Sequence, residues 1–119
     1  MSTRCNVGIY KKIDQRLKKP SVLLYKHSDG YPERMEPLLV DFCNKFDKTR
    51  GLDDTEYCAA QCLYHMMQKD GRNGVDGFGI CGNLIQHVDI SFYYAIYPDR
   101  LEIYDNKYKL IKTIDFKSK

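Results

Sequence analysis

The chain has 119 residues, of which 43% are hydrophobic and 29% are charged, and its formal net charge is +3. This balance is typical of one folded domain, residues 1–119, and excludes a disordered chain. No apolar run approaches the roughly 20 residues of a membrane-spanning helix, and the first residues lack the apolar stretch of a signal peptide. We therefore expect a cytoplasmic protein without a membrane partner.

Two strands are predicted near the start of the chain. Residues 5–11 alternate apolar with small or polar side chains, which is the period of a half-buried strand. Residues 21–27 carry apolar side chains on both faces, which favours a central place in a sheet. The basic segment 11–20 is interpreted as a hairpin loop, and Asp29-Gly30 ends the second strand.

Two helices are predicted to follow. The first has Pro37 in its first turn, where proline is tolerated, and ends near Gly51, where glycine can form a left-handed cap. Its apolar residues recur every three or four positions. The second starts at Asp53 or Asp54, which suit the helix N-terminus, and stops at Gly71.

The rest of the chain is predicted to form one long loop and three strands. Residues 71–86 are rich in glycine and form the loop. Strands are expected at 88–97, 101–105 and 108–116, and the tight turns between them make an antiparallel meander. The element order ββααβββ predicts an α+β fold, in which both helices pack on one face of a single antiparallel sheet of about five strands.

The five cysteines, an odd number, argue against a disulfide framework and for buried thiols. Cys58, Cys62 and His65 share one face of the second predicted helix, and Cys81 would complete a tetrahedral zinc site. The C-x2-C spacing that zinc sites often use is missing. We therefore favour buried thiols over zinc.

Two other patterns suggest ligands but have simpler explanations. Residues 77–82 match G-x-G-x-x-G, but a helix and a loop precede the motif and a strand follows it, so no dinucleotide cofactor is expected. Basic residues gather at 11–19 and 107–119, where they could touch nucleic-acid phosphates. The modest net charge favours a solvated loop and a polar strand face instead.

Two of the three histidines are followed two places later by an aspartate, at His27 and Asp29 and at His87 and Asp89. Residues two apart in a strand point to the same face, so each pair sets an imidazole beside a carboxylate. The second pair would lie with Tyr93 on an outward face, opposite the apolar face of its strand. If the two strands were neighbours, both pairs would line one surface. The alternative is structural: one aspartate caps a turn, and His87 bonds a loop carbonyl.

Several motifs resemble those of a known family. They are STRCNVGI at 2–9, YKHSDGYPE at 25–33, GLDDTEY at 51–57, GFGI at 77–80 and HVDISFYYAIYP at 87–98. Together they resemble a family of small phage and prokaryotic proteins that has no established activity, so the resemblance implies a common origin but no reaction. Family members often carry an aromatic residue where this chain has Ser28, and this departure argues against ligand stacking there.

The leading hypothesis is a non-catalytic binding module for a small molecule or a protein, for example a phage-derived accessory protein. Its candidate binding residues are His27, Asp29, Tyr31, Glu33, His87, Asp89 and Tyr93. The first alternative is a metal-dependent hydrolase or phosphodiesterase, in which the two His-x-Asp pairs hold a metal that activates water. Its metal ligands would be His27, Asp29, His87 and Asp89. The second alternative is nucleic-acid binding through residues 11–19 and surface tyrosines, which predicts a steep dependence on salt.

Overall fold

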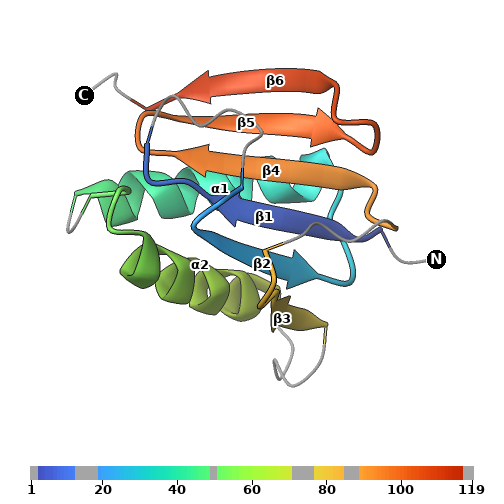
Figure 1. Ribbon diagram of the computed structural model, residues 1–119, viewed down its shortest axis with the longest axis horizontal. Coiled ribbons are helices and arrows are strands. Elements are labelled where there is room, and N and C mark those ends of the chain that lie inside the picture. The colour runs from blue at the N-terminus through green and yellow to red at the C-terminus, as the bar shows by residue number, and fades with distance from the viewer. Residues whose placement is uncertain (1–2, 13–18, 49–50, 71–76, 85–88, 117–119) are drawn as a thin grey trace.

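In the computed structural model, two helices pack on one face of a six-stranded sheet (Figure 1). The structure describes residues 3–12, 19–48, 51–70, 77–84 and 89–116. The elements are β1 (Cys5–Ile9), β2 (Val22–Lys26), α1 (Pro32–Asp47), α2 (Thr55–Asp70), β3 (Phe78–Ile80), β4 (Phe92–Tyr97), β5 (Arg100–Asp105) and β6 (Leu110–Asp115). The predicted α+β class, with both helices on one face, is confirmed. Among the described residues, no helix has the length and apolar character needed to cross a membrane.

The sheet has the order β3-β2-β1-β4-β5-β6, and its central pair, β1 and β4, is parallel. Its other neighbouring strands are antiparallel. The prediction of a purely antiparallel sheet is therefore wrong, and the sheet has six strands where about five were predicted. The reason is that side-chain alternation reports which face a residue occupies, and carries no information about the direction of the neighbouring strand.

Three elements differ from their predictions. α1 starts at Pro32, which puts Pro37 in its second turn and not its first, because proline suits the first helical position and Glu33 places an acid in the first turn. Pro37 lies inside the helix, and the carbonyl that it leaves without a helical donor belongs to the exposed Glu33. β3 was not predicted, because three residues around a glycine are too few to show alternation. β4 starts at Phe92, later than expected, because a turn and a bend precede it.

The main core lies between the helices and the sheet. It combines side chains from both helices with those on the helix-facing side of β1, β2, β4 and β5. Four of the cysteines are buried in it, namely Cys5, Cys43, Cys58 and Cys62. The prediction of buried thiols is therefore confirmed for these four, and Cys81 is partly exposed.

The opposite face of the sheet carries a second buried cluster, which we call the tyrosine cluster. It consists of Tyr10, Leu23, Ile90, Tyr93, Ala95, Tyr97 and Tyr104. Alternation correctly placed Tyr93 away from the helices, but its exposure is 0%, so the prediction that this face looks outward is wrong. A face without helices is not necessarily exposed, because residues outside the strands can cover it, as Ile90 and Leu84 do here.

Polar groups inside the tyrosine cluster are bonded to one another. The hydroxyls of Tyr10 and Tyr93 lie 2.6 Å apart. The fully buried carboxylate of Glu102 accepts from Nε of Arg100 at 2.9 Å and from the hydroxyl of Tyr104 at 2.5 Å. These bonds offset the cost of removing the hydroxyl and carboxylate groups from water.

Candidate functional site

Arg4 connects the two segments that carry the predicted His-x-Asp pairs. It precedes β1, the strand that separates β2 from β4 in the sheet. Its Nε donates to Nδ1 of His27 at 3.3 Å, and its Nη1 lies 3.4 Å from Oδ2 of Asp89. The prediction of a shared surface required β2 and β4 to be neighbours, and they are not. His27 and Asp89 nevertheless have Arg4 as a common partner.

Tyr25 completes what we call the Arg4 cluster (Arg4, Tyr25, His27 and Asp89). Its hydroxyl lies 2.8 Å from Nδ1 of His27. Arg4 can only donate, so Nδ1 of His27 is the acceptor in their contact. Burial raises the pKa of the Tyr25 hydroxyl against the opposing effect of Arg4, and Asp89 adds to the rise. Tyr25 therefore stays protonated at neutral pH and serves as a hydrogen-bonding group.

The other predicted site residues lie in different surroundings. Asp29 has left-handed backbone, with φ of 57°, in the turn before α1, a conformation that aspartate adopts more readily than most residues. Tyr31 and Glu33 are exposed where α1 begins. Tyr93 is buried in the tyrosine cluster. His87 lies outside the described residues, so its place remains a prediction.

The metal hypothesis gains no ligand set from the described part of the chain. There, no group of three or more His, Cys, Asp and Glu side chains is placed to hold a metal ion. Nδ1 of His27 already accepts a hydrogen bond from Arg4. The guanidinium of Arg4 also lies beside Asp89 and supplies this carboxylate with the positive charge that a metal would supply. The hydrolase thus remains a prediction that depends on His87.

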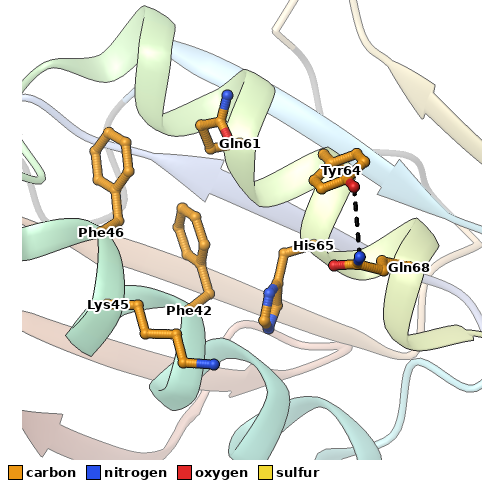
Figure 2. Close-up of a pocket in the computed structure, with 7 residues that line it drawn as sticks. All are labelled: Phe42, Lys45, Phe46, Gln61, Tyr64, His65 and Gln68. Carbon is orange, nitrogen blue, oxygen red and sulfur yellow. Dashed lines mark hydrogen bonds between the residues drawn. The ribbon is translucent and has the colours of Figure 1, made fainter. Parts of the chain in front are cut away.

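A groove between α1 and α2, the interhelical groove, is a second candidate site, and Figure 2 shows the side chains around its first hollow. That hollow has a volume of about 340 Å³ and is lined by Phe42, Lys45, Phe46, Gln61, Tyr64, His65 and Gln68. The rings of Phe42 and Phe46 stack with centroids 5.5 Å apart and form an apolar floor. Gln61, Tyr64 and Gln68 are exposed at the rim. The volume falls in the range of roughly 300–1,000 Å³ that is typical of ligand sites.

His65 brings a titratable group to the wall of this hollow. Its Nε2 is the one buried polar side-chain atom in the described part of the chain that has no hydrogen-bond partner. It lies 3.6 Å from Oδ2 of Asp41, which is beyond hydrogen-bonding distance. Burial lowers the pKa of His65, and Asp41 opposes this effect only in part. The imidazole is therefore neutral at pH 7 and keeps an unused hydrogen-bonding position.

A second hollow continues the groove toward the start of α1 and the end of α2. It has a volume of about 470 Å³ and is lined by Arg34, Pro37, Leu38, Asp41, Lys45 and Lys69. Lys45 lines both hollows, so the two lie next to each other along α1, and we treat them together as the interhelical groove. Arg34 donates from Nη2 to the carbonyl oxygen of Lys69 at 3.3 Å and joins the two helices at this end. One half of the groove is therefore basic, and the other is mainly aromatic and amide-lined.

The sequence hypotheses missed both Arg4 and the groove. Arg4 precedes a strand and has no motif of its own, so only the sheet order reveals its role. The groove did leave a signal, because Gln61, Tyr64 and Gln68 recur at helical spacing on one side of α2. Such polar stripes usually mark a solvated helix face, and the stripe on its own does not indicate a hollow.

Comparison with protein-family models, curated proteins and solved structures found no match to this chain. The family resemblance noted in the sequence therefore remains a prediction. The function has to be inferred from the geometry of the chain itself.

Proposed function

We propose that this protein is a binding module that holds its partner in the interhelical groove. One observation carries the proposal: the helices border an open hollow with an aromatic floor, an amide and hydroxyl rim, and the unpartnered Nε2 of His65 in its wall. An apolar floor supplies binding free energy through burial, and a few polar groups above it fix the orientation of the ligand. This combination is typical of a recognition site.

The groove suits binding better than the Arg4 cluster does. In that cluster the guanidinium, imidazole, hydroxyl and carboxylate bind one another, so a ligand would have to break existing contacts. In the groove, the rim amides of Gln61 and Gln68 are exposed to solvent, and the amide of Gln68 donates to the hydroxyl of Tyr64 at 3.4 Å. A ligand there gains hydrogen bonds and displaces solvent from the phenylalanine floor.

Indole and phenol, two neutral aromatic probes, test the groove without assuming the chemistry of the natural partner. We expect ¹H–¹⁵N NMR titration to shift the amides of Lys45, His65 and Gln68. Gln61→Trp should suppress these shifts, because the larger ring fills the hollow from its exposed rim. Glu56→Trp is the matched control, because it adds the same ring at an exposed position of α2 that does not line the groove.

Two outcomes would overturn the proposal. One is the absence of saturable shifts in the groove, while the protein keeps its folded NMR spectrum. The other is a probe response that Gln61→Trp and Glu56→Trp change equally. Saturable shifts confined to Arg4, Tyr25 and Asp89 would instead move the binding site to the Arg4 cluster.

A further inference from the structure

From the same groove we infer the class of partner: an extended polypeptide segment with a large apolar side chain followed within a few residues by acidic ones. This inference rests on the proposed function and adds the chemistry of the ligand. The apolar side chain would lie over Phe42 and Phe46, and the acidic residues would lie over the basic hollow.

The length of the groove favours a chain segment over a small molecule. Its lining on α1 runs from Arg34 to Phe46, and a rise of about 1.5 Å per residue makes this span roughly 18 Å. An extended peptide advances about 3.3 Å per residue, so five or six residues would fill the groove. A single compact ligand would occupy only one of the two hollows.

The charge of the second hollow selects for acidic residues. Arg34, Lys45 and Lys69 line it against one carboxylate, that of Asp41. Lys45 lies 3.3 Å from Asp41 but keeps 69% of its side chain exposed. The carbonyl end of α2 adds partial negative charge, part of which Arg34 offsets by its bond to Lys69. Among the side chains that line this hollow the cations outnumber the carboxylates, so the lining attracts carboxylates and repels basic segments.

The rim supplies the groups that a peptide backbone needs. Side-chain amides donate and accept at once, which matches the N–H and C=O groups of an extended chain. Gln61 and Gln68 stand at the rim on α2, and Figure 2 shows Gln61 near the phenylalanine rings and Gln68 beside His65. A lipid or a simple aromatic acid would leave these amides unused. The arrangement therefore favours a polypeptide.

Fluorescence anisotropy with short synthetic peptides tests this inference. The main probe is Trp-Ser-Asp-Glu-Asp-Glu with fluorescein at its C-terminus, and the two comparison peptides replace either the acids by lysines or the tryptophan by glycine. We expect the main probe to bind at least about tenfold more tightly than either comparison peptide, and its binding to weaken as salt is raised.

Charge reversal then locates the acidic end. Lys45→Glu combined with Lys69→Glu should weaken binding of the main probe by about tenfold. Lys107→Glu combined with Lys109→Glu is the control, because it makes the same change of net charge at exposed positions beside the β5–β6 turn. The control pair should leave the affinity within about twofold of the original protein.

The results separate this inference from the proposed function. If indole and phenol still bind in the groove while the lysine peptide binds as well as the acidic one, the inference is wrong and the binding function stands. Equal losses from the two double variants would also overturn it, because the attraction would then be non-specific. If neither the neutral probes nor any peptide binds, both proposals fail.

Discussion

Replacing Gly8 with alanine tests how tightly the tyrosine cluster closes over β1. A Cβ at this position would lie 1.9 Å from the hydroxyl oxygen of Tyr93 and 2.9 Å from its Cζ. Tyr93 is fully buried, so its ring has no solvent to move into and must shift within the cluster. The shift would break the 2.6 Å contact between its hydroxyl and that of Tyr10.

The magnitude follows from three contributions. Forcing a packed side chain to move costs roughly 1–3 kcal/mol. Leaving the buried hydroxyls of Tyr10 and Tyr93 without their shared bond costs roughly 1–3 kcal/mol more. The lower entropy of alanine in the unfolded chain offsets about 0.5–1 kcal/mol. We therefore expect Gly8→Ala to lower the free energy of unfolding by about 3 kcal/mol, and Tm by roughly 12 °C.

Urea denaturation followed by circular dichroism measures this loss. Gly82→Ala is the control, because a Cβ there meets nothing within 4 Å, and its effect should stay within about 0.5 kcal/mol. Tyr93→Phe removes the hydroxyl oxygen that clashes with the new methyl group. In that background, Gly8→Ala should cost at least about 1 kcal/mol less than in the original chain. Strict additivity, or a loss below about 0.5 kcal/mol for Gly8→Ala alone, would refute the reasoning.

Three further predictions concern buried titratable groups. Burial lowers the pKa of His65 in the folded protein, so as the pH falls the unfolded chain binds a proton at His65 before the folded protein does. The free energy of unfolding should therefore be highest above about pH 6.5 and decline toward about pH 5. His65→Gln should reduce this decline in urea denaturation, and an unchanged slope would contradict the assignment. Glu102→Gln weakens the buried contacts to Arg100 and Tyr104 and should lower the free energy of unfolding by about 2 kcal/mol. Its control is Glu36→Gln, at the exposed ion pair with Lys112, which should lower it by no more than about 0.5 kcal/mol in the same assay. Similar losses from the two variants would count against the buried network. Burial raises the pKa of the Cys5 and Cys58 thiols to about 12. Burial raises the pKa of Cys81 too, but this thiol is partly exposed, so Ellman's reagent at about pH 8 should react faster with Cys81 than with the four buried cysteines. If the fastest phase survives Cys81→Ser, this prediction is wrong.

Local sequence patterns located most elements because each pattern reflects a local requirement. The apolar spacing of α1, the acidic start of α2 and the alternation along β4 are each properties of one segment. The parallel pairing of β1 with β4 is not a property of one segment, because it depends on which strands meet after the helices have packed. β3 also depends on context: Gly79 interrupts its alternation, and pairing with β2 gives it strand geometry.

The candidate site was predicted only in part for the same reason. Spacing singled out His27 and Asp89 as members of two separate His-x-Asp pairs, and the structure joins these two residues through Arg4. Nothing in the spacing indicated a third strand between them. Tyr93 was assigned to the correct face of the sheet but to the wrong environment, because residues such as Leu84 and Ile90 cover that face. Coverage by loops leaves no periodic signal in a sequence.

The central position of β1 has a consequence for how the chain acquires its fold during synthesis. β1 can pair with β2 early, but its other edge must wait for β4, which begins at Phe92. Until then, the ribosome-bound chain exposes unpaired backbone groups on a buried, apolar strand, which is a template for pairing with other chains. A fragment ending at Asp70 should therefore self-associate in light scattering, whereas the full chain should not. In this fold the central strand pair cannot form before more than ninety residues have been made, so premature termination leaves a buried strand with an open edge.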